Sequence, residues 1–165
     1  MGDLSSLSIL IVDDNKSMRS IASAALKSIG VRHITEAADG ASALAVLRNH
    51  DIDVAIVDFS MRPLNGIEFT RLVRNSPDAR QPYLPILMMT GHGDKTRVNE
   101  ARDAGVTEFM VKPITAKALI DRMQAIIMRP RPFIRTDDFF GPDRRRSAAL
   151  GRNLRRRKGD TAPET

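Results

Sequence analysis

The chain lacks cysteine altogether, and it lacks any apolar run long enough to cross a bilayer. Without cysteine it forms neither disulfide bonds nor thiolate metal sites, which is compatible with a reducing cytoplasm. Residues 1–6 carry no basic stretch followed by a long apolar one, so we expect no secretory signal peptide. A membrane-spanning helix needs about 20 apolar residues. We therefore expect a soluble, cytoplasmic protein.

Most of the chain also lacks a net charge, although the protein as a whole is basic. The 165 residues carry a formal net charge of +6, and this size suits one domain with an extension. Residues 1–128 contain 15 basic and 15 acidic side chains, whereas residues 129–165 contain 11 basic and 5 acidic ones. The excess positive charge therefore belongs to the last part of the chain and is uninformative about the rest.

Short apolar runs, rich in β-branched residues, alternate with helical patterns over residues 1–128. Such runs are typical of strands buried on both faces of a parallel sheet. We expect strands at residues 7–12, 33–37, 54–57, 85–89 and 109–111. We expect helices from Asn15 or Ser17 to about Ile29, from Gly40 through Leu47, from Asn65 through Val73, from Lys95 to Ala104 and from Ala116 to Met128. The alternation predicts an α/β fold, a doubly wound five-stranded parallel sheet flanked by five helices.

Charged and hydroxyl side chains follow four of the expected strands. They are Asp13 and Asp14, Asp58, Thr90 and Lys112. We expect them to converge, because functional groups in open α/β sheets gather at the carboxyl ends of the strands. Three carboxylates without histidine or cysteine select a hard cation such as Mg²⁺, while Lys112 and Thr90 can hold a phosphoryl group. Asp58 is the best candidate for the nucleophile, since the Asp13–Asp14 pair is better arranged to bind the ion.

The segments around these residues closely resemble the receiver domain of two-component response regulators, of the CheY-like kind. The matching segments are residues 11–14, 57–61, 89–91 and 109–113. Each residue alone would suit a helix cap, a turn or a solvated side chain, but together, in this order, they are specific. The resemblance covers residues 6–128. It implies the flavodoxin-like receiver fold, a Mg²⁺ cofactor, and a sensor histidine kinase or phosphotransfer protein as partner.

The resemblance also assigns roles by position. Asp58 would be the phosphoacceptor and would bind Mg²⁺ together with Asp13, Asp14 and the backbone carbonyl of Ser60. The remaining positions would be the switch hydroxyl Thr90, the aromatic switch Phe109, the phosphate-pairing cation Lys112 and Pro113, whose peptide bond would be cis. Phe109 suits the core as well as the switch, because it stands beside Met110 and Val111.

The loop after the third expected strand departs from the family pattern. Arg62 stands between Met61 and Pro63, whereas the family usually has proline directly after the methionine. We expect this to affect the loop and not the chemistry. The rival class, a metal-dependent phosphatase with an aspartate nucleophile, usually has a second aspartate two residues after the first. That place holds Ser60, so we expect phosphorylation and dephosphorylation of Asp58 itself and no turnover of external substrates.

Residues 129–165 are too short for a DNA-binding or catalytic output domain and too poor in aliphatic residues for a second core. Pro130 and Pro132 end the last helix. Ten of the eleven cations in this region are arginine, whose planar fork binds phosphate and guanine edges bidentately. We expect an arginine-rich tail that is disordered or becomes ordered on ligand binding.

This tail resembles the arginine-rich extensions of CheY-like effectors that bind cyclic di-GMP and act on the flagellar motor. Arginines would contact phosphates or guanines, a phenylalanine would stack on a base, and an aspartate would accept from guanine. The candidates are Arg131, Arg135, Asp138, Phe139, Phe140, Asp143, Arg144, Arg145, Arg146, Arg152, Arg155 and Arg156. Two alternatives stay open: a solvated tail with no defined ligand, or a patch that binds nucleic acid, anionic membrane or an acidic partner non-specifically.

Overall fold

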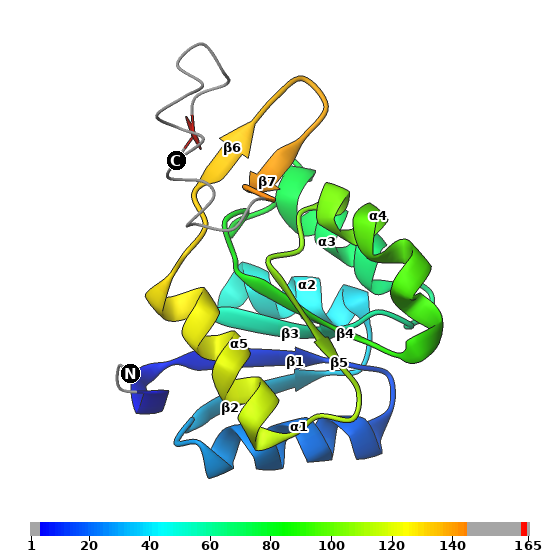
Figure 1. The fold of residues 1–165 in the computed structure, drawn as a ribbon. Coiled ribbons are helices and arrows are strands. Elements are labelled where there is room, and N and C mark those ends of the chain that lie inside the picture. The colour runs from blue at the N-terminus through cyan, green and yellow to red at the C-terminus, as the bar shows by residue number, and fades with distance from the viewer. Residues whose placement is uncertain (1–3, 145–162, 165) are drawn as a thin grey trace.

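A central sheet of five parallel strands organises the chain (Figure 1). The computed structural model describes residues 4–144 and 163–164. The strands of this sheet are β1 (Ser8–Val12), β2 (His33–Ala37), β3 (Val54–Asp58), β4 (Ile86–Thr90) and β5 (Glu108–Val111). Their order is β2-β1-β3-β4-β5, and each neighbouring pair is parallel. The direction of winding reverses between β1 and β3, which is where doubly wound sheets place their functional groups.

Helices cover both faces of the sheet. They are η1 (Leu4–Ser6), α1 (Lys16–Ser28), α2 (Gly40–Asn49), α3 (Gly66–Asn75), η2 (His92–Arg97), α4 (Val98–Ala104) and α5 (Ala116–Met128). The hydrophobic clusters place α1 and α5 on one face and α2, α3 and α4 on the other (Figure 1). The predicted doubly wound fold is therefore confirmed for the part of the chain that the structure describes.

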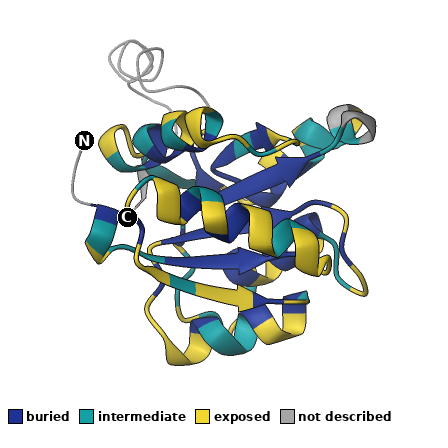
Figure 2. Ribbon diagram, turned by 90° about the horizontal axis from the view of Figure 1, so that it is seen from below, coloured by how far each residue is buried: buried dark blue, intermediate teal, exposed yellow. Residues whose placement is uncertain are grey.

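The central strands are buried on both sides, as their continuous apolar runs predict. Ile9 and Ile11 of β1 pack toward α1 and α5, whereas Leu10 and Val12 pack toward α2 and α3. All four side chains have no exposed surface. Figure 2 shows the sheet as a buried layer between helices whose outer faces are exposed. The core thus fixes the position of the strand ends, where the polar residues lie.

Side-chain caps set the starts of most helices. Asn15 caps α1 by accepting from the Met18 amide, and Asn65 forms a capping box with Glu68 at the start of α3. The expected helix from Lys95 is shorter than predicted, because residues 92–97 form the 3₁₀ turn η2 and α4 begins at Val98. This start has no side-chain cap, since the nearest acid, Asp94, accepts from the Gly91 amide instead.

Residues 129–144, here called the C-terminal hairpin, pack against the domain and do not form the expected tail. They contain β6 (Phe133–Arg135) and β7 (Phe140–Pro142), which pair antiparallel. The two-residue strand β8 (Pro163–Glu164) pairs with the other edge of β6. β7 contacts α3 and α4 (Figure 1). The expectation of an extension without its own packing is therefore wrong for residues 129–144.

Aromatic packing explains why this segment folds although Ile134 is its one aliphatic residue. Phe139 and Phe140 are only 9% and 5% exposed. The Tyr83 ring lies 5.0 Å from the Phe133 ring and 5.5 Å from the Phe140 ring, in edge-to-face arrangements. Such pairs contribute beyond the area that they bury, by about 0.5–1.5 kcal/mol each. Three rings thus replace the aliphatic core that the sequence lacks in this region.

Arg74 of α3 connects the hairpin to the domain through the Phe133 ring. Its guanidinium is buried, donates to the carbonyl groups of Pro82, Leu84 and Gly105, and lies 5.0 Å from the centre of the Phe133 ring. Burial lowers the pKa of Arg74 to about 9, so the side chain stays charged at neutral pH.

Among the described residues, no helix has the length and apolar character that crossing a bilayer requires.

Candidate functional site

The carboxyl ends of β1 and β3 bring three aspartates together. Val12 and Val57 are partners in the parallel register, so Asp13 and Asp14 lie next to Asp58 at the same edge. One carboxylate oxygen from each of the three lies within 4.8 Å of the others. Gly66, at the start of α3, permits a close approach here, because a Cβ atom would meet the Asp58 carbonyl oxygen at 2.7 Å. The structure thus assembles the predicted acidic cluster.

The buried carboxylates are poorly satisfied by the protein itself. Asp13 is 1% exposed; its Oδ1 accepts from the Asn15 amide at 2.9 Å, while its buried Oδ2 has no hydrogen-bond partner. Burial raises the pKa of Asp13, partly offset by the Asn15 bond and by Lys112. Asp14 is exposed to solvent beside it. The described cluster consists of carboxylates alone, and one of their oxygens has no partner. This combination suits a hard divalent cation such as Mg²⁺.

Lys112 forms an ion pair with this cluster. Its Nζ lies 2.7 Å from Oδ1 of Asp58, whose side chain is 6% exposed. Burial raises the pKa of Asp58, while the Lys112 bond opposes that rise and the charge of Asp13 adds to it. The Lys112 amide donates to the Thr90 carbonyl, and the Lys112–Pro113 peptide is cis, as the resemblance implies. The chain geometry thus aims the lysine at Asp58.

Thr90 and Phe109 lie on the neighbouring strands β4 and β5. Thr90 is the last residue of β4 and is 5% exposed. Phe109 of β5 is half-buried and packs against a cluster that includes Ile67, Met88 and Ala104. Arg102 of α4 lies over its ring, 5.7 Å from the centre. The aromatic side chain therefore joins β5 to α4, with one side against the core and one toward solvent.

The loop after β3 carries the remaining predicted site residue. Ser60 is exposed and follows Asp58 by two positions. The Arg62–Pro63 peptide is cis, so the departure from the family pattern coincides with a second cis bond near the site. The amide of Gly66 donates to the Phe59 carbonyl, which closes this loop onto the start of α3. The backbone of the loop thus returns to the acidic edge although Arg62 stands where the family usually has proline.

Four of the predicted tail residues, Arg135, Asp138, Phe139 and Phe140, line one pocket of about 310 Å³ together with Arg71 and Asp103 of the domain, whereas Arg131 and Arg144 line a different pocket. Phe139 and Phe140 are buried against the domain, so neither ring is presented for stacking on a base. Asp143 is 2% exposed. Asp138 accepts from the Thr136 hydroxyl. Arg145, Arg146, Arg152, Arg155 and Arg156 lie outside the described residues.

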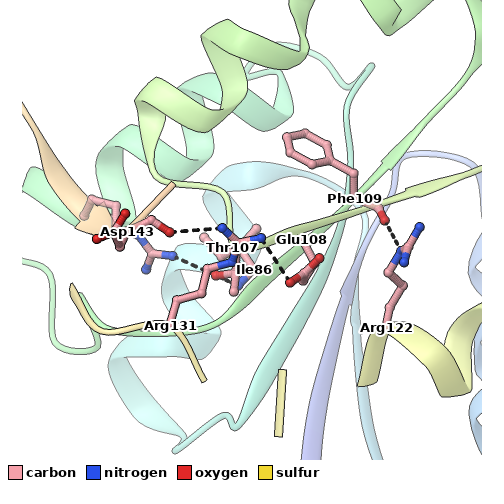
Figure 3. Close-up of polar contacts among 8 residues, drawn as sticks. Ile86, Thr107, Glu108, Phe109, Arg122, Arg131 and Asp143 are labelled. Atoms are coloured by element: carbon pink, nitrogen blue, oxygen red, sulfur yellow. Dashed lines mark hydrogen bonds and ion pairs between the residues drawn. The ribbon is translucent and has the colours of Figure 1, made fainter. Parts of the chain in front are cut away.

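The arginines of the hairpin contact the domain instead. Arg131 pairs with Glu108 of β5 and donates to the Asp143 carbonyl, and Figure 3 shows these contacts beside β5. Arg144 pairs with Asp103 of α4 and lies over the Phe139 ring. Arg135 lies over the Phe140 ring. Ligand roles inferred from the resemblance would therefore compete with contacts that hold the hairpin in place.

Sequence analysis missed Arg74, Tyr83 and Glu108, which receive the hairpin. Arg74 had one usable signal, since it follows the buried residues Ile67 and Thr70 by seven and four positions, which is helical spacing, and so lies on the inner side of α3. Tyr83 and Glu108 gave none, because an exposed loop residue and the first residue of a strand normally face solvent. Their importance depends on residues more than 20 positions away along the chain.

Comparison with known proteins gives a consistent result. The sequence profile described as "Response regulator receiver domain" matches residues 9–124. The chemotaxis protein CheY of Pseudomonas aeruginosa is 37% identical over 123 residues, covering 74% of this chain and 98% of that protein. The chemotaxis protein CheY-3 of Vibrio cholerae is 36% identical over 123 residues, covering 74% of this chain and 93% of that protein.

Solved structures agree with the sequence comparisons. Vibrio cholerae CheY4 superposes with a TM-score of 0.66 and 32% identity, covering 73% of this chain and 98% of that one. The receiver domain of a sensor histidine kinase from Pseudomonas aeruginosa superposes with a TM-score of 0.63 and 27% identity, covering 72% of this chain and 94% of that one. That structure has a magnesium ion coordinated in its active-site cleft.

Proposed function

Since the chain belongs to the response regulator receiver domain family, we propose that it is a response regulator that accepts a phosphoryl group on Asp58. The donor would be a sensor histidine kinase or a phosphotransfer protein. The observation that carries the proposal is the contact of Asp58 with Lys112 at 2.7 Å inside a cluster of three aspartates. Lys112 thereby holds one carboxylate oxygen of Asp58, and the Asp58 side chain lies beside Asp13 and Asp14.

The chain's own residues supply most of what phosphoryl transfer requires. An oxygen of Asp58 would attack phosphorus, the bond from phosphorus to the donor nitrogen would break, and an acyl phosphate would form. Lys112 would pair with the phosphoryl oxygens, and the Thr90 hydroxyl would donate to one of them. Mg²⁺, held by Asp13, Asp14, Asp58 and the Ser60 carbonyl, would supply positive charge next to the same oxygens.

Charge repulsion supports the requirement for a metal. Asp13 and Asp58 are both buried, and burial raises the pKa of each. Adding a phosphoryl group would place further negative charge among these acids, with Lys112 as the one cation within ion-pair distance among the described residues. A divalent cation on the unpaired Oδ2 of Asp13 would offset this charge. We therefore expect phosphorylation to depend on Mg²⁺.

The site favours modification of the protein itself over catalysis on external substrates. An aspartate-based phosphatase would need a second acid two residues after Asp58 to protonate a leaving group, and that place holds Ser60. The reactions that we propose are therefore phosphorylation and dephosphorylation of Asp58 alone.

Phosphate would draw the Thr90 hydroxyl inward, and Phe109 would move with it. This carries the signal to the face formed by α4, β5 and α5.

Cyclic di-GMP is the ligand that we propose for the arginine-rich residues after Met128, with a flagellar motor protein or another signalling protein as the downstream target. Their composition supports this, with ten arginines among eleven cations. Because Phe139 and Phe140 are buried, stacking on either ring would require the hairpin to open.

Calorimetry with cyclic di-GMP and cyclic di-AMP tests whether the arginine-rich residues bind cyclic di-GMP specifically. Equal binding of both, or competition by random DNA, would leave a non-specific polyanion patch or a solvated tail.

Intact-mass spectrometry after incubation with a small phosphodonor tests the phosphoacceptor proposal. We expect one phosphoryl group per chain in the presence of Mg²⁺ and none with EDTA. The Asp58→Asn protein should stay unmodified, whereas Asp51→Asn, at an exposed acid, should be modified like the parent. Modification of Asp58→Asn to the same extent would contradict the assignment.

A further inference from the structure

A groove lined by arginines lies between β5, α4, α5 and the C-terminal hairpin. Its volume is about 280 Å³. Three separate parts of the chain contribute a guanidinium to it, and β5 contributes an acid and a ring. The lining includes Arg102 of α4, Arg122 of α5, Arg131 and Arg144 of the hairpin, and Glu108 and Phe109 of β5. The groove shares no lining residue with the acidic cluster at the carboxyl ends of the strands.

Two of these arginines are not neutralised within the described part of the chain. Arg131 pairs with Glu108, and Arg144 pairs with Asp103. Arg122 donates its Nε to the Phe109 carbonyl, as Figure 3 shows, and Arg102 lies over the Phe109 ring. No described carboxylate lies within ion-pair distance of Arg102 or Arg122. The groove therefore combines excess positive charge with two guanidinium groups, those of Arg102 and Arg122, that no described carboxylate neutralises.

We propose that this groove is a second anion site, which binds the phosphate group of a phosphate ester. A phosphate has three or more acceptor oxygens and up to two negative charges, so it can accept from two guanidinium groups at once. A carboxylate has two oxygens, which a single arginine fork satisfies, and Glu108 already fills that role for Arg131. Arg131 and Arg144 already have carboxylate partners, whereas Arg102 and Arg122 have none among the described residues. The groove thus favours an anion with more acceptor oxygens than a carboxylate.

The size of the groove limits the ligand. Pockets for drug-sized molecules measure about 300–1,000 Å³, so about 280 Å³ suits one phosphate with its nearest substituent. A longer ligand would extend outward past Arg102 and Arg122, which are exposed. The site is absent without the C-terminal hairpin, because Arg131 and Arg144 form one of its walls.

Titration of the full chain with inorganic pyrophosphate, followed by nuclear magnetic resonance, tests the site. EDTA is present throughout, so that the three aspartates repel the anion. We expect saturable shifts at the Arg102 and Arg122 Nε–H groups and at the Phe109 amide. Arg102→Gln and Arg122→Gln should each weaken binding about tenfold, since a charge-assisted hydrogen bond is lost. Arg122→Lys, which keeps the charge but not the fork, should weaken it less.

The matched control is Arg80→Gln, because Arg80 is exposed, lies outside the groove and donates a hydrogen bond to the Arg48 carbonyl. It should bind pyrophosphate like the parent. Equal affinity of the Arg102→Gln, Arg122→Gln and parent proteins would overturn the proposal. So would tighter binding of a hexaglutamate peptide, which would mark the groove as a docking site for an acidic protein. Parallel titrations with 5′-GMP and cyclic di-GMP distinguish a terminal phosphate monoester from a cyclic phosphodiester as the preferred ligand. Phosphorylation of Asp58 is measured separately, so either proposal can fail alone.

Discussion

The two ends of the sheet hold their buried charges in opposite ways. At the carboxyl ends, Asp13 and Asp58 are buried among acids, Lys112 pairs with Asp58, and one oxygen of Asp13 has no hydrogen-bond partner. At the other end, Arg74 donates to three carbonyl groups and Arg131 pairs with Glu108. Charges whose partners lie inside the fold stabilise it, whereas under-compensated charges favour a ligand.

The largest expected effect is on the stability of the end that holds Arg74. Arg74→Met keeps most of the apolar stem but leaves the buried carbonyl groups of Pro82, Leu84 and Gly105 without their donor. At about 1–3 kcal/mol per buried unsatisfied group, with partial compensation by water, we expect a loss of about 3 kcal/mol in the free energy of unfolding. Urea denaturation measures it.

Arg80→Met is the control for this comparison, because it removes an exposed arginine from the loop after α3. Its effect should stay within about 0.5 kcal/mol. If both substitutions destabilise the protein equally, the carbonyl groups around Arg74 are not dependent on it, and the contrast between the two ends of the sheet is weakened.

A smaller loss is expected at the ion pair that holds the hairpin to β5. The side chains of Arg131 and Glu108 are 13% and 6% exposed, so Glu108→Gln leaves a nearly buried guanidinium facing a neutral amide. We expect a loss of about 2 kcal/mol, because breaking a buried pair costs more than the pair contributes. Phosphorylation of Asp58 should persist.

The exposed pair Lys117–Asp121 provides the matched control. Its side chains are 88% and 54% exposed, so Asp121→Asn should change the free energy of unfolding by less than about 0.5 kcal/mol. A Glu108→Gln protein as stable as the Asp121→Asn protein would show that the Arg131–Glu108 pair does not hold the hairpin to β5.

The smallest expected effect on stability, of opposite sign, belongs to the acidic edge. Burial raises the pKa of Asp13 in the folded protein above its ordinary value of 3.8. The folded state then binds its proton more tightly than the unfolded chain does. The contribution of Asp13 to the free energy of unfolding is therefore most favourable below its ordinary pKa. It is lost as the pH rises through the raised pKa. Without Mg²⁺, Asp13→Asn should be more stable than the parent at pH 7 and equally stable near pH 3.

Thermal unfolding across this pH range, with and without Mg²⁺, measures the difference. Mg²⁺ should stabilise the parent more than the Asp13→Asn protein, because the cation offsets the same repulsion. Asp51→Asn, at an exposed acid, should follow the parent at every pH. A parent protein that is more stable than Asp13→Asn at neutral pH without metal would contradict under-compensation at this edge.

Patterns within short segments predicted most of the receiver fold. The strand at residues 33–37 and the helix from Ala116 to Met128 have the predicted bounds, because apolar spacing, caps and the prolines after Met128 are local signals. The register of β1 and β3 then brings Asp13, Asp14 and Asp58 together, as strand-end logic requires. The start of α4 was predicted wrongly, since no capping side chain marks it.

Contacts between distant segments could not be predicted in this way. Phe133 and Phe140 lie in a region whose composition indicates a solvated tail, and their burial depends on Tyr83, 50 and 57 positions away. Nothing near Tyr83 in the sequence indicates that a ring from the end of the chain will pack on it. The arginine groove depends in the same way on α4, α5 and the hairpin meeting at β5.

The site of phosphorylation is the most direct test of the central claim, that the under-compensated acids of the sheet edge accept a phosphoryl group. Treating the phosphorylated protein with borohydride reduces an aspartyl phosphate to homoserine, and tandem mass spectrometry of peptides locates the converted residue. The account predicts homoserine at position 58 and unchanged aspartate at positions 13 and 14. Conversion at another aspartate, with position 58 intact, would contradict it.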